Sequence, residues 1–147
     1  MNTENQPGII CDSVLLLDTT FWRSPDFPEV PHNSISFNSD VQYSTDAPNT
    51  GAVILSCAMF VHDGNEKGKT HAEFKCNYVG LFKTEENKEN LQLKEFLDKY
   101  APAILLPYVR ELLSSTFARA GLPPFVLPPV NVLAMINKET TSDTTED

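Results

Sequence analysis

The sequence predicts an α+β fold, in which four mostly antiparallel strands are followed by helices. Between residues 9 and 82, four segments either alternate apolar with polar residues or are almost continuously apolar, as strands do. Turn-forming residues separate these segments. After residue 84 the apolar residues take the spacing of amphipathic helices. A run of strands followed by a run of helices is an α+β layout.

The first strand region is the strongly apolar segment 9–17. The next segment, 21–31 (FWRSPDFPEVP), contains three prolines in eleven residues. Proline breaks helices and removes a donor that a central strand needs, so we predict a crossover loop here. This loop carries Trp22 and Phe27 and is unusually apolar for a loop.

Three further strands follow the crossover. Segment 34–43 alternates and predicts a half-buried strand. Segment 52–62 (AVILSCAMFVH) is nearly continuously apolar and predicts a central strand. Segment 70–82 alternates again, with His71 on the side expected to be exposed. Gly64 and Gly68, both expected at positive φ, lie in the turn between the last two strands and predict a hairpin.

Two longer helices and one short helix are expected after the strands. Segment 84–100 has helical periodicity, and Pro102 is expected to end or bend that helix. A second helix is expected from about Ile104, which places Pro107 in its first turn. Gly121 then occupies the position of a left-handed C-cap. Residues 122–129 predict an extended strap, and Asn131 can cap a short last helix.

Length and charge limit the classes of protein. The 147 residues favour one domain, which we assign to 9–137, with disordered polar tails at 1–8 and 138–147. A net charge of −9 argues against direct nucleic-acid binding. No apolar run approaches the roughly 18 residues of a membrane span, so no membrane insertion is expected. The first residues lack the basic and apolar regions of a signal peptide, so we expect a cytoplasmic protein.

The residue types that carry chemistry do not form a catalytic or metal-binding pattern. The three cysteines are widely spaced and odd in number, which argues against a disulfide framework, and two of them are expected to be buried. The three histidines lack metal-ligand spacing. No phosphate-binding glycine loop or nucleophile elbow is present. We predict no enzyme activity, no metal and no cofactor. The three cysteines are Cys11, Cys57 and Cys76, and the three histidines are His32, His62 and His71.

The chain has a surplus of apolar residues in the crossover loop, the second helix and the strap. Two interpretations remain open at this point. The surplus can fill the core and a subunit interface. Alternatively, part of it can stay accessible as a groove for other apolar chains.

Segment 101–136 carries a specific pattern of residues. A helix opens with PAILLPYVRE (102–111), a proline-rich strap follows, and PVN (129–131) precedes the last helix. Two shorter matches, LDTTF (17–21) and VGLF (79–82), lie in the strand region. In these residues the chain resembles the SecB family of bacterial export chaperones.

The resemblance implies a four-stranded antiparallel sheet with helices packed on one face, and dimers that pair into a homotetramer. It also implies a cytoplasmic chaperone that binds unfolded polypeptides without ATP and keeps them competent for translocation and export. In the family, apolar grooves bind these clients. The positions transferred by the resemblance are Trp22, Phe27, Ile35, Phe37, Leu127, Leu133 and Ile136.

One partner expectation is weakened by departures from the family. Members that pass clients to the translocase motor SecA present acidic residues near the first strand exit and on the exposed sheet. Asp18 keeps one such place, whereas Trp22–Arg23 and Lys75 occupy the others. Because Lys75 would repel a basic partner, SecA is a possible but disfavoured partner. The alternatives are a chaperone dedicated to one client, such as an antitoxin, or an oligomeric interaction module without chaperone activity.

Overall fold

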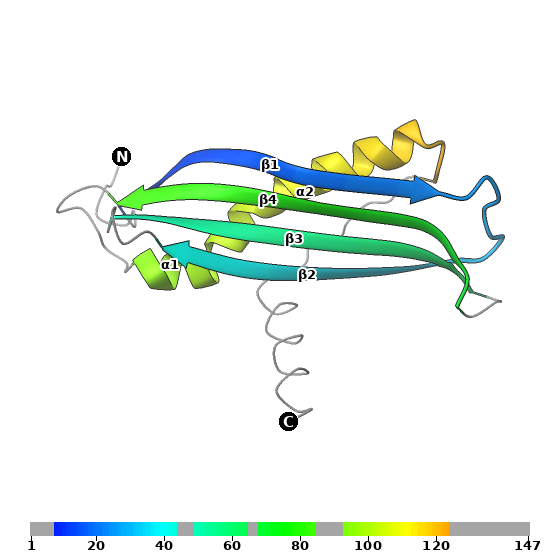
Figure 1. The fold of residues 1–147 in the computed structure, drawn as a ribbon, viewed down its shortest axis with the longest axis horizontal. Helices are drawn as coiled ribbons and strands as arrows, with labels where there is room; N and C mark the ends of the chain where they lie inside the picture. Colours follow the sequence, from blue (N-terminus) through cyan, green and yellow to red (C-terminus); the bar gives the residue numbers. More distant parts are fainter. Residues whose placement is uncertain (1–7, 44–48, 65–67, 85–92, 124–147) are drawn as a thin grey trace, which may run out of the picture.

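Four long strands form a single antiparallel sheet in the computed structural model, which describes residues 8–43, 49–64, 68–84 and 93–123. The order across the sheet is β1-β4-β3-β2, so the hairpin of β3 and β4 is central and the first two strands form the edges (Figure 1). The predicted four-stranded antiparallel sheet is therefore confirmed. The strands are β1 (Ile9–Arg23), β2 (Pro31–Tyr43), β3 (Thr50–Asp63) and β4 (Thr70–Thr84).

The crossover between the two edge strands is shorter than the predicted segment 21–31. β1 continues to Arg23 and β2 begins at Pro31, which leaves residues 24–30 as the loop. The pairing extends this far because β2 is an edge strand and Pro31 is its first residue, a position where proline is tolerated.

The edge strand β1 is irregular. Its register against β4 shifts between Cys11 and Ser13, and again between Leu16 and Asp18. Such a bulge inserts an extra residue and bends the strand. Beside the second bulge three consecutive leucines are 42–52% exposed, which regular alternation would not allow. These are Leu15, Leu16 and Leu17.

The central hairpin supplies most of the sheet's contribution to the core. β3 alternates strictly between buried and half-buried residues, as its central position requires. Cys57 and Cys76 lie directly opposite each other across β3 and β4, and both are buried and free, as predicted. A hydrogen bond to Cys76, together with burial, raises the pKa of the Cys57 thiol, which therefore stays protonated. These two thiols are small core side chains.

The helices pack on one face of the sheet. In Figure 1 the strands lie in front and α1 (Leu93–Lys99) and α2 (Ala101–Arg119) lie behind them. The longer helix buries a stripe at helical spacing against β3 and β4. The buried aliphatic and aromatic residues of this stripe are Leu105, Leu106, Val109, Leu113 and Phe117.

The start of α2 differs from the prediction. The helix begins at Ala101 rather than near Ile104, so Pro102 occupies its first turn and Pro107 lies inside the helix. An N–H in the first turn has no partner within the helix, and the fixed φ of proline suits that turn, so Pro102 is tolerated there. The preceding helix α1 ends at Lys99, as expected for a helix followed by Pro102. Pro107 is exposed, so water can reach the turn whose hydrogen bond it removes.

Two of the three turn glycines behave as predicted. Gly68 has φ of 92° and Gly121 has φ of 70°, which favour glycine over other residues. Gly64 is not at positive φ, contrary to the prediction. Glycine is needed there for a different reason, because a Cβ would lie 2.9 Å from the carbonyl oxygen of Val30 in the crossover loop.

Several predicted segments lie outside the described residues. They are the tails at 1–7 and 138–147, the start of the first predicted helix (85–92), the strap beyond residue 123 and the short helix after Asn131. The division into one domain, 9–137, and two tails stays a prediction.

A glycine in β4 allows α2 to approach the sheet closely. A Cβ on Gly80 would lie 2.9 Å from Cδ2 of Leu105 and 2.8 Å from Cε2 of Phe82. Both neighbours are almost completely buried, so neither can swing away into solvent.

We therefore expect Gly80→Ala to lower the free energy of unfolding by about 1–3 kcal/mol through overpacking. Urea unfolding measures the loss. In a Leu105→Ala background the close contact with the helix is removed and that with Phe82 remains, so the same substitution is expected to cost less. Equal costs in the two backgrounds would show that Leu105 does not set the distance between the helix and the sheet.

Candidate functional site

The crossover loop (residues 24–30) meets the end of α2 at one end of the sheet. The aromatic rings of Phe21, at the end of β1, and Phe117, in the last turn of α2, contact each other with centroids 6.0 Å apart. Phe27 from the crossover loop packs against the same core and remains partly exposed. Leu122, just after α2, is buried beside them. These four residues lie together where the crossover loop meets the end of α2.

Arg23 joins the crossover loop to α2. Its guanidinium donates hydrogen bonds to the carbonyl oxygens of Ser24 (2.9 Å), Pro25 (3.4 Å) and Ala120 (2.7 Å). The guanidinium carbon also lies 5.8 Å from the ring centre of Phe27, within the range of a cation–π contact. One side chain therefore contacts both the loop and the C-cap residue of α2.

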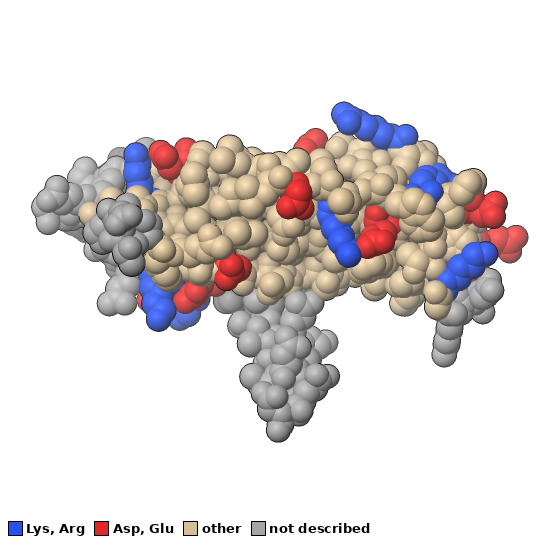
Figure 2. Space-filling model, viewed as in Figure 1, with Lys and Arg blue, Asp and Glu red and all other residues tan. Residues whose placement is uncertain are grey.

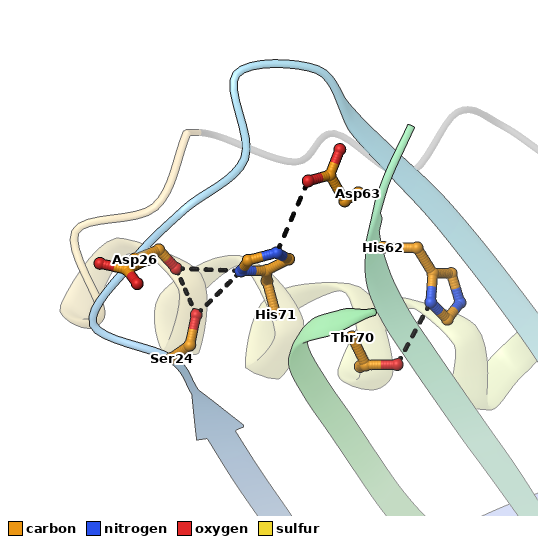
Figure 3. A network of polar contacts seen from close by, with 6 residues as sticks. All are labelled: Ser24, Asp26, His62, Asp63, Thr70 and His71. Carbon is orange, nitrogen blue, oxygen red and sulfur yellow. Dashed lines mark hydrogen bonds and ion pairs between the residues drawn. The ribbon is translucent and has the colours of Figure 1, made fainter. Parts of the chain in front are cut away.

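His71 holds the crossover loop from the β4 side, as Figure 3 shows. Its Nδ1 lies 3.0 Å from the hydroxyl of Ser24 and 3.2 Å from the carbonyl oxygen of Asp26. Its Nε2 faces the carboxylate of Asp63 at 4.0 Å. His62 is turned away, with Nδ1 3.3 Å from the hydroxyl of Thr70.

The prediction that His71 is exposed is wrong. The residue is only 3% exposed, because the crossover loop lies against it. The amide of Ser24 also donates to the carbonyl oxygen of His71, at 2.7 Å, which continues the β1–β4 pairing into the loop. Alternation within β4 gave the direction of the side chain but could not show that a distant loop covers it.

The structure separates the groove positions that the sequence grouped together. Trp22 lies on the sheet face away from the helices, between the helix-facing Phe21 and Arg23, and is 51% exposed. Phe27 and Ile35 are partly buried and pack against the core. Phe37 is 1% exposed and belongs to the core itself, so in this fold it is not accessible to a client. Leu127, Leu133 and Ile136 lie outside the described residues.

The sheet face away from the helices is mostly uncharged, as Figure 2 shows. The Asn77 side-chain amide donates to the Asp18 carboxylate at 2.8 Å and accepts a hydrogen bond from Ser56. Next along β4, Lys75 pairs with Glu73 at 2.9 Å. Asp18 is exposed on this face, where it belongs to a polar belt with Asn77, Lys75 and Glu73.

The resemblance placed Arg23, together with Trp22, near the exit of the first strand, where other family members present an acidic residue. The structure places Arg23 on the helix side, where it contacts Ala120. The alternation of Phe21, Trp22 and Arg23 along β1 was the signal that could have shown this. The role of Ala120 could not be foreseen, because it is 97 positions away in the sequence.

Neither a metal site nor a membrane helix is found in the part of the chain that the structure describes. Within residues 8–43, 49–64, 68–84 and 93–123, no three His, Cys, Asp or Glu side chains are grouped so that they could hold a metal ion. Among these residues, no helix is long and apolar enough to cross a membrane.

Comparison with known proteins decides the family. The family model for SecB, described as preprotein translocase subunit SecB, matches residues 14–143. The chain belongs to the SecB family. The predicted resemblance is confirmed, and the protein is a divergent member of a family of non-enzymatic protein-export chaperones.

Individual relatives are distant. The protein-export protein SecB of Nitrosomonas eutropha is 28% identical over 139 residues, which cover 92% of this chain and 86% of the relative. The SecB of Xanthomonas campestris is 30% identical over 135 residues, covering 88% and 75%. Among solved structures, the SecB-like chaperone of Mycobacterium tuberculosis, in complex with a ChAD peptide from the HigA1 antitoxin, has a similar fold. Its TM-score is 0.71 at 18% identity, with coverage of 83% of this chain and 90% of that chain.

His71 gives a direct test of how the crossover loop is held. We expect His71→Ala to lower the free energy of unfolding by about 1–3 kcal/mol, because the polar loop atoms that it contacts lose a buried partner. Limited proteolysis is expected to cut the variant faster within residues 24–30. His62→Ala is the matched control, since His62 is a neighbouring histidine that does not contact this loop. Equal protease sensitivity of the two variants would contradict the role given to His71.

Proposed function

We propose that this SecB-family protein binds non-native polypeptides on apolar surfaces without ATP, in the cytoplasm, and keeps them competent for export. The observation that carries the proposal is the incomplete covering of the apolar residues where β2 and the crossover loop meet the core. Phe27 and Ile35 pack against the core on one side and keep part of their surface open. Accessible apolar side chains beside a complete core are typical of surfaces that bind other chains.

The energetics suit an unfolded client. An extended chain must be ordered on binding, which opposes capture. Burial of apolar side chains returns about 25 cal/mol for each Å² removed from water. Several modest contacts on one oligomer add up through effective concentration, so no single deep pocket is required. Release then follows when the client folds or another partner competes for it.

A second function is favoured by one comparison. The Mycobacterium tuberculosis chaperone was solved with a peptide from an antitoxin, so a role dedicated to a single client is the alternative that we propose. A non-chaperone interaction module is the third reading, and it requires the exposed apolar residues to serve self-association alone. These three readings predict different behaviour toward an unrelated unfolded protein.

Unfolded clients, rather than SecA, are the main partners that we propose. A basic partner approaching the exposed sheet would meet Lys75 beside Glu73, and Asp18 already accepts a hydrogen bond from Asn77. Lys75 offsets one of the two carboxylates, which weakens the attraction that would steer a basic partner to this face.

Self-association into a dimer of dimers is part of the proposal. Three leucines of the edge strand β1, Leu15 to Leu17, are about half exposed. An apolar, unpaired strand edge is a strong association surface. The helix α2 adds Ile104 and Tyr108, which are 37% and 46% exposed. Two separate apolar surfaces allow two kinds of contact, as a dimer of dimers requires.

The client-binding proposal is tested with an unrelated protein diluted from denaturant. Stoichiometric amounts of the native assembly are expected to slow its aggregation, measured by light scattering. We expect Ile35→Asp to require about threefold or more protein for the same protection, because a charge replaces an apolar contact. Thr20→Asp, on the opposite sheet face, is the control and is expected to act like the natural protein.

This assay distinguishes the three proposed functions. Protection of the unrelated protein supports the general chaperone. No protection at several-fold excess, with tight binding of one natural polypeptide, supports the dedicated chaperone. No binding of any unfolded chain supports the interaction module.

The assembly proposal is tested by light scattering of the purified protein. A mass near four chains is expected. Leu17→Asp is expected to shift the mass toward smaller species, because it places a charge on the apolar edge. Val30→Asp is the control, since Val30 is equally exposed but lies in the crossover loop. A monodisperse monomer of the natural protein would rule out the proposed tetramer.

A further inference from the structure

Arg23 has an unusual set of partners for a partly buried charge. All three hydrogen bonds of its guanidinium go to main-chain carbonyl oxygens. Among the residues that the structure describes, no carboxylate forms an ion pair with it. A partly buried arginine usually has an acidic partner. Here the planar guanidinium donates several hydrogen bonds in fixed directions. These contacts fix the relative positions of the main-chain segments that accept them and do not neutralise a carboxylate.

The contact with Ala120 places a positive charge at the C-terminus of α2. Ala120 is the C-cap residue of that helix, and its carbonyl oxygen is one of those that a helix leaves unpaired. A cation there is also favoured by the helix dipole. The shortest of the three hydrogen bonds, at 2.7 Å, is the one to this oxygen. The helix end is therefore a well-suited anchor for Arg23.

The remaining contacts of Arg23 are with the crossover loop. Two donors hold the carbonyl oxygens of Ser24 and Pro25, and the guanidinium lies over the ring of Phe27. Phe27 is one of the two partly open apolar residues on which the proposed function depends. The same guanidinium therefore sets the position of Phe27 relative to the end of α2.

The loop is also fixed from its other side. His71 contacts Ser24 and Asp26, and the amide of Gly64 donates to the carbonyl oxygen of Val30 at 2.7 Å. These contacts tie the loop to the β3–β4 hairpin. Only Arg23 connects it by hydrogen bonds to α2 within the described residues. Loss of Arg23 would leave the loop attached to the sheet but free to shift relative to the helix.

We propose that Arg23 is a positioning residue for polypeptide binding, which clamps the crossover loop to the C-terminus of α2 and so holds Phe27 in place for extended apolar segments of a client. The inference rests on the proposed function and adds the residue that pre-arranges the site. A pre-arranged loop need not be ordered when the client arrives, which strengthens binding without adding a contact. Lysine cannot replace arginine fully, because an ammonium lacks the planar fork.

The test uses the full-length protein and a tryptophan-free unfolded polypeptide, reduced and carboxamidomethylated ribonuclease A, at physiological salt. Isothermal titration calorimetry measures the affinity, and the tryptophan-free polypeptide adds no signal to the fluorescence of Trp22, the only tryptophan of the chain. We expect Arg23→Gln to weaken binding about fivefold and Arg23→Lys to weaken it less. Hydrogen exchange of the amides in residues 24–30 is expected to become faster in Arg23→Gln.

Two controls separate positioning from stability. Gly80→Ala lowers stability away from the loop and is expected to leave the affinity unchanged. Phe27→Ala is expected to weaken binding in the natural background but to have little further effect in Arg23→Gln, because a displaced ring no longer contributes. A purely structural role for Arg23 would instead give effects on binding that simply add.

Each outcome is decisive. Unchanged affinity of Arg23→Gln, or additive effects with Phe27→Ala, would overturn the inference while the proposed function stands. Absence of binding by the natural protein would overturn the proposed function itself. If Arg23→Gln does not fold, Arg23→Lys is compared with the unsubstituted protein instead. The same affinity for the polypeptide and the same hydrogen-exchange rates in residues 24–30 would then overturn the inference that Arg23 positions the loop.

Discussion

The molecule depends on one topological constraint, which is that the chain must pass from one edge of the sheet to the other across the end of a hairpin. The order β1-β4-β3-β2 makes this crossing unavoidable. A seven-residue connection with two prolines has few ways to satisfy its own backbone. Arg23, His71 and Gly64 meet that need from three directions. Arg23 belongs to β1, His71 to β4, and Gly64 to the turn that follows β3, so the loop, the hairpin and the helix are held in one arrangement.

The same constraint explains how much the sequence could predict. Local patterns were sufficient for the four strands, the central hairpin, the buried cysteines and the apolar stripe of α2, since each reflects a periodicity within one segment. His71 was placed wrongly because a loop distant from β4 in the sequence covers it, and Pro107 because α2 begins at Ala101. The contact of Arg23 with the C-cap of α2 had no signal in the local pattern, because Ala120 lies 97 positions away. The predicted groove residues do not all lie on one surface, because alternation along β1 places Trp22 on the face opposite to that of Phe21 and Arg23.

The two faces of the sheet therefore have different properties. The helix-covered face is closed by tight packing, with Gly80 allowing direct contact between Leu105 and the strand. The opposite face is broad, mostly uncharged and crossed by a hydrogen-bonded belt that contains Asp18 and Asn77. Partly covered or exposed apolar residues lie on the edge strands and the crossover loop, and on α2 at Ile104 and Tyr108. In this SecB-family chain accessible apolar surface is thus present both along the edges of the sheet and on the helix that covers it.

The two bulges of β1 have a consequence for assembly. A straight apolar edge could add strand after strand from further copies and grow into a fibril. Each shift in register bends the strand and breaks the even spacing of its free amides and carbonyls. Regular backbone spacing along this edge is therefore confined to the short stretches 9–11, 13–16 and 18–23. The irregular edge therefore disfavours the continuous addition of further strands from other copies of the chain.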